Sequence, residues 1–362
     1  MQIGIVGLPN STKTTIFNAL THSQVETAAT SSGKVEVNTA MVEVPDPRIN
    51  LLSELYHPEK TTFARVQYND VAGLKVGSGQ DGTLSGQLLN TISQSDALLH
   101  VVRAFDDDHI PHPAGNVDAI RDLAALDFEF LFSDLQIVER RLERLAHDLD
   151  RKGTYPERSV DQAEFDLFTR LKDGLEEEKP LRKLQFSKVE EKIMRGYQFL
   201  TAKPALVALN VGDRGSENPA DFSIDEDNQY EIICLHGALE MEISQLSKED
   251  ADLFLAEYGI DEPGLNRMIR LNYELLGLQS FFTVGEDEVR AWTIPQGANA
   301  VEAAGVIHSD LSRGFIRAEV VSYQDLVDAG SYAEARKKGT VRLEGKDYIV
   351  QDGDILNIRF NV

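Results

Sequence analysis

Residues 1–15, MQIGIVGLPNSTKTT, carry the strongest fold signal in the chain: a short apolar strand runs directly into a loop rich in hydroxyl side chains. The loop follows the pattern GxxxxGK[ST] at Gly7, Lys13 and Thr14, but Thr12 stands where the second glycine belongs. Such loops wrap backbone N–H groups around phosphates at a helix N-terminus, with the lysine on the terminal phosphates and the hydroxyl on Mg²⁺. The sequence predicts a nucleotide site; the alternative is a plain strand, turn and helix.

The threonine at position 12 bears directly on the quality of that site. Glycine is usual there because the backbone approaches phosphate closely, and a β-branched side chain restricts the approach. The loop residues that we predict to contact the nucleotide are Asn10, Ser11, Thr12, Lys13, Thr14 and Thr15.

Composition places the chain among ordinary globular proteins with two or three domains, since it has 362 residues, of which 42% are hydrophobic and 27% charged. No stretch approaches the roughly 18 consecutive apolar residues of a membrane span, and the N-terminus enters a strand at once, so we expect a cytoplasmic protein without a membrane partner. The net charge of −24 argues against extensive non-specific nucleic-acid binding. The single cysteine, Cys234, lies in an apolar run, which predicts a buried thiol.

Apolar or alternating runs at 64–68, 97–102, 205–209 and 230–235 are separated by helical or loop stretches. Strands that alternate with helices indicate a mostly parallel sheet covered on both faces. The predicted fold class is therefore α/β.

A long charged segment interrupts this alternation. Apolar residues within 131–149 step by four and three, and a second amphipathic stretch around 168–175 follows a break at Gly153 and Pro156. We expect an inserted antiparallel helical hairpin; the alternative is a bundle packed against the sheet. From about residue 281 the chain changes to short β-like pieces with glycine turns, including 348–350. The predicted domains are 1–128 with 201–280, the hairpin 129–200, and a small α+β domain 281–362.

Two further elements fall at the ends of predicted strands. Asp70-Val71-Ala72-Gly73 is a DxxG motif, in which the aspartate would hold Mg²⁺ and the glycine N–H would sense the γ-phosphate. Asn210-Val211-Gly212-Asp213 would read a purine base, although the same letters also suit a turn. A guanine site usually offers NKxD, so Val211 weakens the case for GTP while Asp213 keeps part of it. The predicted metal ligands are Thr14 and Asp70, and the predicted nucleotide contacts include Gly73, Asn210, Val211 and Asp213.

Leu74 follows the DxxG motif, where Ras-like GTPases carry the glutamine that orients the attacking water. A leucine cannot position water, so hydrolysis needs another group. The loop 106–112 offers His109 and His112, and we select His112 as the catalytic candidate beside Lys13; a solvated loop histidine is the alternative.

Taken together, these motifs resemble the YchF-type Obg-like ATPase family, a branch of the Obg-related P-loop NTPases, over essentially the entire chain. The resemblance implies a G domain, an inserted helical hairpin and a C-terminal TGS domain of β-grasp type. It also implies hydrolysis of ATP in preference to GTP, association with ribosomes, a hydrophobic residue at Leu74 and a loop histidine at His112. The stretches that carry the resemblance are 7–10, 44–48, 70–74, 100–105, 262–267, 288–294, 314–318 and 344–354.

The first switch departs from the family pattern. Lys34 stands where the family carries the threonine that completes the Mg²⁺ shell. Four nearby hydroxyl side chains could replace it, and the sequence does not choose among them: Thr30, Ser31, Ser32 and Thr39.

Three functional hypotheses follow. The first is a slow Mg²⁺-dependent ATPase whose nucleotide state switches its affinity for a ribosomal partner, in translation or stress regulation. The second is a binding module of the same fold that has lost efficient hydrolysis, which Thr12 and Lys34 favour. The third, a translational GTPase, rests only on Asp213.

Overall fold

The computed structural model describes residues 1–21, 37–71, 86–150, 158–213, 215–222, 224 and 230–361. The chain divides into two compact units, which are taken separately below. The first contains Met1–Ala40 and Gln67–Met268, and the second contains Met41–Val66 and Ile269–Val362.

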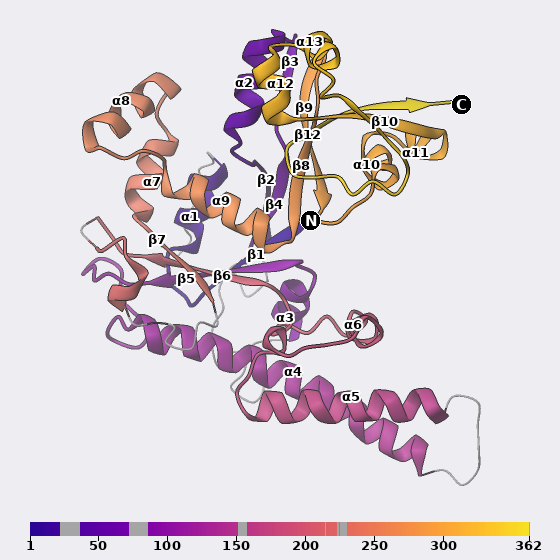
Figure 1. The fold of residues 1–362 in the computed structure, drawn as a ribbon. Helices are drawn as coiled ribbons and strands as arrows, with labels where there is room; N and C mark the ends of the chain where they lie inside the picture. Colours follow the sequence, from indigo (N-terminus) through magenta and orange to yellow (C-terminus); the bar gives the residue numbers. More distant parts are fainter. Residues whose placement is uncertain are drawn as a thin grey trace. The chain divides into compact units, whose positions relative to one another are not determined.

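The first unit is built on a six-stranded sheet in the order β2-β4-β1-β5-β6-β7 (Figure 1). Strand β1 lies between β4 and β5 and pairs with both in parallel, and the parallel pairing continues through β6 and β7. Four strands confirm the runs predicted from sequence, and their side chains are mostly buried, as expected for parallel strands inside an α/β sheet. The strands are β1 (Gln2–Val6), β2 (Val37–Glu43), β4 (Arg65–Val71), β5 (Ala97–Arg103), β6 (Ala205–Asn210) and β7 (Glu231–Leu235).

The helices of this unit follow the strands along the chain. Cys234 on β7 is buried, as the sequence predicts, and burial raises the pKa of its thiol to about 11. The helical elements are α1 (Lys13–Thr21), α3 (Gly86–Ser93), α4 (Ala119–Leu149), α5 (Arg158–Glu176), η1 (Leu181–Lys183), α6 (Lys188–Met194), η2 (Pro219–Phe222), α7 (Gly237–Ser244), α8 (Lys248–Tyr258) and α9 (Gly264–Leu275), the last of which continues into the second unit.

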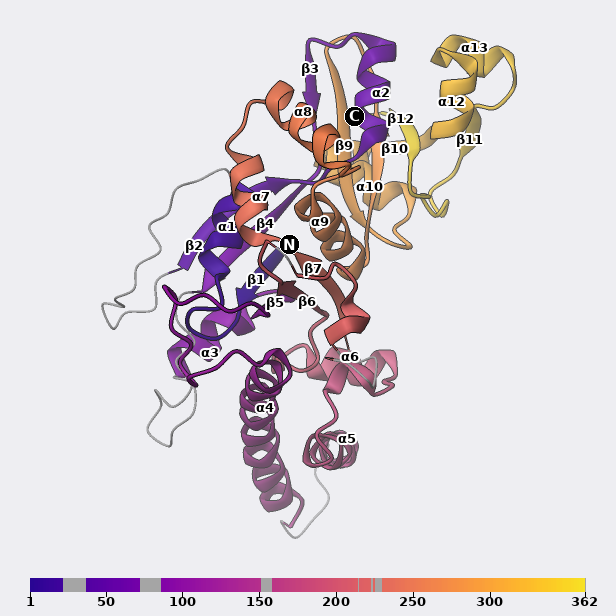
Figure 2. The same cartoon turned by 90° about the vertical axis from the view of Figure 1, so that its left-hand side faces the viewer.

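Helices α4 and α5 lie side by side and form the predicted hairpin (Figures 1 and 2). Leu126 and Phe130, in the first half of α4, pack in the core cluster of the sheet. The second half of α4 leaves that core, and its Val138 packs instead with Phe168 and Leu171 of α5. The hairpin thus has a hydrophobic core of its own, which is why the heptad stripe was visible in the sequence.

The second unit is a mixed sheet in the order β11-β10-β12-β8-β9-β3, with α10 packed on it through a cluster that includes Phe281, Ile294, Ala303 and Val320. A helix across such a sheet is the β-grasp arrangement. The predicted β-like piece at 348–350 is not a strand; Ile349 forms only an isolated bridge with Asn299. The elements are α2 (Pro47–Tyr56), β3 (Lys60–Thr62), β8 (Leu278–Thr283), β9 (Glu288–Pro295), α10 (Ala300–Ile307), α11 (Ser309–Arg313), β10 (Phe315–Ser322), α12 (Tyr323–Ala329), α13 (Tyr332–Lys337), β11 (Arg342–Glu344) and β12 (Asp354–Phe360).

Among the described residues, none of the helices combines the length and the apolar character that crossing a membrane requires.

Candidate functional site

The loop between β1 and α1 holds two residues other than glycine in the left-handed region. Asn10 has φ 61° and Thr12 has φ 69°. For a β-branched residue this conformation is costly, so something must hold Thr12 in place. Its hydroxyl donates to the Ser11 carbonyl and accepts a 2.7 Å hydrogen bond from Asn210 Nδ2. Thr12 is thus fixed by a residue at the far end of β6.

Lys13 lies folded back on its own loop. Its Nζ donates to the carbonyls of Gly7 and Leu8, both at 2.8 Å, and the side chain is buried. Burial lowers the pKa of Lys13 to about 8, against the opposing effect of the nearby Asp70 carboxylate. The Lys13 ammonium group therefore lies inside the phosphate loop. This is the place that the terminal phosphates of a nucleotide would occupy.

Thr14 and Asp70 meet at the start of α1 and the end of β4. The Thr14 hydroxyl donates to Asp70 Oδ2 at 3.1 Å, while Oδ1 of the same carboxylate is buried without a hydrogen-bond partner among the described residues. Burial raises the pKa of Asp70, opposed chiefly by Lys13. A hydroxyl beside an orphaned carboxylate oxygen is a donor set that suits Mg²⁺, so these residues fit the ion predicted from the sequence.

Asn210, at the end of β6, connects three segments. Its Nδ2 donates to Thr12, and its Oδ1 accepts from the backbone N–H of Gly237 at 3.0 Å, at the start of α7. A Cβ at position 237 would lie 2.6 Å from Asn210 Nδ2, so glycine is needed for this approach. Asn210 thereby holds the phosphate loop against the segment after β7, and its amide is engaged by the protein itself.

A pocket of about 590 Å³ opens at the carboxyl ends of β5 and β6. This is the edge of a parallel sheet at which ligands bind in open α/β folds. Of the residues predicted from sequence, five line it: Thr12, Thr15, Asn210, Val211 and Asp213. Asn10, Ser11, Lys13 and Thr14 lie in the adjoining loop and helix start. The other lining residues are Phe105, Asp106, Asp107, Ile110, Gly212, Gly215 and Ala238.

Arg103 shapes one wall of this pocket. Its buried guanidinium donates to the carbonyls of Phe105, Ile110 and Asp107 at 2.9, 2.7 and 3.4 Å, and it lies 4.8 Å from the centre of the Phe105 ring. The sequence did not lead us to predict that this wall and Ala238 line the pocket. The signal available was Arg103 itself, a charged residue that ends an otherwise apolar strand.

His112 lies in the loop between β5 and α4 but does not line the pocket. Its Nε2 is 2.7 Å from Asp122 Oδ2, its Nδ1 accepts from the N–H of Ala114, and its side chain is 5% exposed. Both ring nitrogens are therefore engaged. The preceding residue is tied to the phosphate loop, because Asn10 Nδ2 donates to the Pro111 carbonyl at 2.9 Å. His109 is exposed.

Several residues considered from sequence lie outside the described ranges: Thr30, Ser31, Ser32, Lys34, Gly73 and Leu74. Thr39 is described, and its hydroxyl donates to Asn69 Oδ1 at 3.0 Å. Asn69 and Asp70 are successive residues of β4 and so point to opposite faces of the sheet. Thr39 therefore lies on the other face from the Thr14–Asp70 pair.

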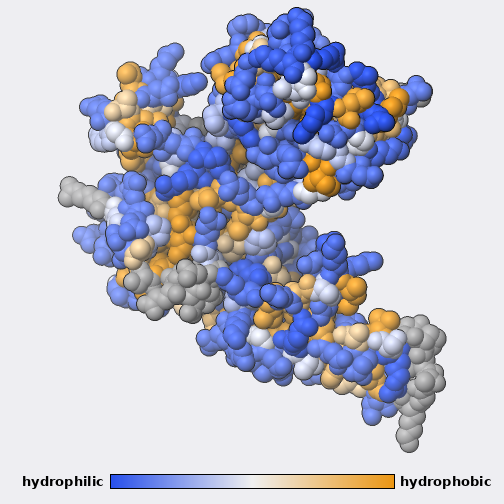
Figure 3. All heavy atoms as spheres, viewed as in Figure 1, coloured by the Kyte–Doolittle hydropathy of each residue, from blue (hydrophilic) through white to orange (hydrophobic). Residues whose placement is uncertain are grey.

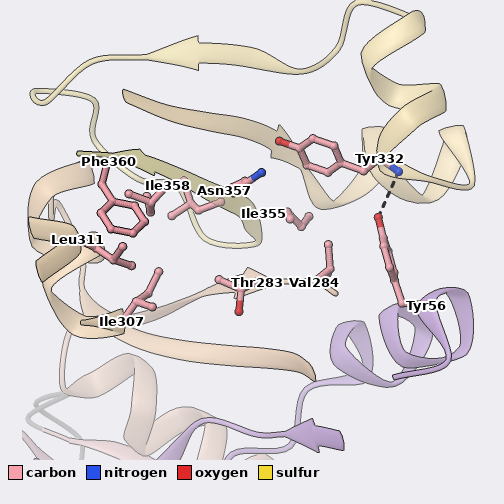
Figure 4. A pocket seen from close by; sticks show the side chains of 11 residues that line it. Tyr56, Thr283, Val284, Ile307, Leu311, Tyr332, Ile355, Asn357, Ile358 and Phe360 are labelled. Carbon is pink, nitrogen blue, oxygen red and sulfur yellow. Dashed lines mark hydrogen bonds between the residues drawn. The ribbon is translucent and has the colours of Figure 1, made fainter. Parts of the chain in front are cut away.

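A second pocket, of about 350 Å³, lies within the second unit (Figure 4). Ile307, Leu311 and Ile358 face into it, and on another side the backbone N–H of Tyr332 donates to the Tyr56 hydroxyl at 3.2 Å. The described residues that line it include no charged side chain, so it offers no cation for a phosphate.

Comparisons with known proteins agree with this architecture. Residues 2–129 match a family described as "50S ribosome-binding GTPase", and residues 278–361 match the YchF GTPase C-terminal family, described as "Protein of unknown function (DUF933)". The chain is 42% identical to "Ribosome-binding ATPase YchF" of Bacillus subtilis, covering 100% of both chains. It is 40% identical to the protein of the same name in Escherichia coli O157:H7, covering 100% of this chain and 99% of that protein.

A solved structure, titled "Structure of the Schizosaccharomyces pombe YchF GTPase", superposes with a TM-score of 0.87 at 34% identity, covering 99% of this chain and 97% of the other. Identity at this level over the full length, together with the phosphate loop, the helical hairpin and the β-grasp unit, establishes that the chain belongs to the YchF family.

Proposed function

We propose that this protein is a slow Mg²⁺-dependent ATPase that binds the ribosome in the cytoplasm and uses its nucleotide state as a switch. The observation that carries the proposal is the meeting of Lys13, Thr14 and Asp70 beside a pocket of about 590 Å³ at one edge of the sheet. Ribosome binding and ATP hydrolysis are supported by the names of its full-length relatives.

Each residue has a distinct part in this proposal. Lys13 binds the β- and γ-phosphates once it exchanges the carbonyls of Gly7 and Leu8 for phosphate oxygens. Thr14 and Asp70 hold Mg²⁺, which when bound neutralises phosphate charge. Val211 and Asp213, which line the pocket, contact the base, and Asn210 fixes Thr12 of the phosphate loop.

His112 is the proposed group that orients the attacking water. Its engagement with Asp122 means that the ring must leave this partner before it can reach a γ-phosphate. Because Asn10 binds the Pro111 carbonyl, a change of the phosphate loop on nucleotide binding acts directly on the residue before His112. Hydrolysis is then slow, because each turnover requires the ring to leave Asp122.

The test of nucleotide binding is calorimetric titration with ATP, GTP and their non-hydrolysable analogues, with and without Mg²⁺. Micromolar Mg²⁺-dependent ATP binding that is lost in Lys13→Ala supports the ATPase. Absence of binding at millimolar nucleotide would instead support a scaffold of the same fold whose pocket Thr12 and Lys34 have disabled. Tighter binding of GTP than of ATP would favour the GTPase.

The role of His112 is tested by single-turnover hydrolysis. His112→Ala should lower the rate constant by about tenfold or more while the dissociation constant for ATP stays unchanged, because the ring acts on water and not on the bound nucleotide. His109→Ala is the matched control, since that side chain lies in the same loop and is exposed. An unchanged rate in His112→Ala would remove it from the mechanism.

A further inference from the structure

Helix α8 places no fully buried side chain in the core of the protein: Ala251, Phe254 and Leu255 are half-buried, and its other residues are exposed. None of its residues is buried, and Leu253 and Tyr258 are 70% and 64% exposed. Helices of this length are marginal in water and normally persist because one face packs on a core. A helix without a buried residue therefore needs another source of stability and another reason to be present.

The ends of α8 supply the stability. Ser247 caps the N-terminus, its hydroxyl accepting from the Asp250 N–H at 3.2 Å, and Gly259 ends the helix with φ 65° and hydrogen bonds to Leu255 and Ala256. The rings of Phe254 and Tyr258 stack one turn apart, with centroids 4.5 Å apart. The helix is thus locally built to present a fixed outer surface.

Leu253 is the most prominent feature of that surface, and acidic residues surround it. Glu249, Asp250 and Glu257 lie three or four positions away and so are its neighbours on the helix. In Figure 3 the lobe at upper left, where Figure 1 places α8, shows apolar residues bordered by hydrophilic ones. A partner surface that is complementary to α8 in shape and charge is an apolar pocket with a basic rim.

We infer that α8 is a protein-docking helix, with Leu253 inserted into an apolar pocket bordered by lysine or arginine side chains of a ribosomal protein. This inference rests on the proposed ribosome binding and adds which part of the chain makes contact and with what chemistry. The carboxylates around Leu253 exclude a ribosomal RNA backbone as the partner here, because like charges repel and phosphate binding requires cations. The net charge of −24 likewise disfavours binding of the whole chain to an RNA backbone.

The variant Leu253→Glu tests whether the Leu253 side chain anchors α8 to the ribosome. We expect this variant to bind purified ribosomes about tenfold more weakly than the unaltered protein in co-sedimentation, because an apolar anchor is replaced by a charge in a closed pocket. Basal ATP hydrolysis should be unchanged, since α8 does not touch the nucleotide pocket. The matched control is Val189→Glu on α6, a residue that is also 70% exposed. Equal loss of binding in both variants overturns the inference.

The class of partner is tested by crosslinking. The chain has one cysteine, Cys234, and it is buried, so Leu253→Cys can be labelled selectively with a benzophenone maleimide. Photolysis on purified ribosomes should yield a crosslink to a ribosomal protein. A crosslink to ribosomal RNA, or to a second copy of this chain, overturns the inference.

The two proposals fail in distinguishable ways. If the unaltered protein does not sediment with ribosomes in any nucleotide state, ribosome binding fails and the docking helix fails with it. If the unaltered protein sediments and Leu253→Glu sediments equally well, only the docking helix is overturned.

Discussion

Thr12 is the residue at which local and tertiary requirements compete. Its left-handed backbone is unfavourable for threonine, yet the same backbone lets its hydroxyl meet Asn210. The penalty for such a conformation is about 1–2 kcal/mol, similar to what a hydrogen bond returns. The hydrogen bond to Asn210 thus compensates for the absence of the usual glycine. The cost is that the threonine side chain occupies space in the phosphate loop.

We expect Thr12→Gly to bind Mg²⁺-ATP several-fold more tightly, because it removes the side chain that lines the pocket and lets the backbone approach the phosphates closely. Calorimetric titration measures the change. Thr12→Ser is the control, since it keeps the hydroxyl for Asn210 while removing the methyl group. Weaker ATP binding in Thr12→Gly would show that the hydrogen bond to Asn210 matters more than the space gained beside the phosphates.

Lys13 gives ATP binding a pH dependence. Its pKa of about 8 in the free protein must rise when phosphate charge surrounds it, so above pH 8 binding takes up a proton. We expect ATP affinity to fall as the pH rises from 7.5 to 9.5, with proton uptake visible as a buffer-dependent enthalpy at pH 8.5. In Lys13→Arg, whose cation does not titrate in this range, the remaining affinity should be independent of pH. A flat profile in the unaltered protein would contradict the lowered pKa.

The same shift affects folding in the absence of nucleotide. Because the pKa of Lys13 is lower in the folded than in the unfolded chain, the unfolded chain binds more protons between about pH 8 and pH 10.5. The Lys13 contribution to the free energy of unfolding therefore increases as the pH rises through this window.

Among the elements, α4 is tied by a buried carboxylate to the segment that leads from the hairpin into the sheet. Asp134 on α4 is fully buried, and its two oxygens accept from the backbone N–H groups of Leu200 and Thr201 at 2.9 and 2.8 Å, and from the Thr201 hydroxyl. Burial raises its pKa to about 6 in spite of these bonds. Asp134 thus fixes the point at which the chain leaves the hairpin and enters β6.

Asp134→Ala should lower the free energy of unfolding by about 2 kcal/mol at pH 7, because two buried backbone donors lose their acceptor. Chemical denaturation measures the loss. Glu143→Ala on the same helix is the control and should change stability by less than about 0.5 kcal/mol, since that side chain is exposed. Equal effects in the two variants would argue against the role of Asp134.

At the scale of the whole molecule, the second unit is assembled from two distant parts of the sequence. Residues 41–66 contribute α2 and β3, and β3 pairs in parallel with β9. Arg48 secures this segment: it binds Asp46 and Asp352, the latter at 2.7 Å, and lies 5.2 Å from the centre of the Phe282 ring.

Arg48→Met should destabilise the second unit by about 2 kcal/mol, because it removes charge-assisted hydrogen bonds to two carboxylates. We also expect faster amide hydrogen exchange in α2 and β3 than in the unaltered protein. Lys60→Met is the control, since Lys60 is 69% exposed and 3.8 Å from Glu288, and exposed ion pairs of this kind contribute little. Unchanged exchange in Arg48→Met would mean that β3 pairing alone holds the segment.

Elements whose signals are local could be predicted from the amino-acid sequence. The phosphate loop, the parallel strands and the heptad stripe of the hairpin could be read because strand and helix periodicity, and the loop that joins β1 to α1, depend on residues close together in the chain. The domain boundaries and the catalytic role of His112 stay predictions.

Contacts between residues far apart in the chain could not be predicted in this way and became visible in the folded structure. The fold brings Asn210 to Thr12, Asn10 to Pro111 and residues 41–66 to the C-terminal segment. These contacts join parts of the chain that no local pattern relates, and several involve buried polar groups that are stable only when the whole fold supplies their partners.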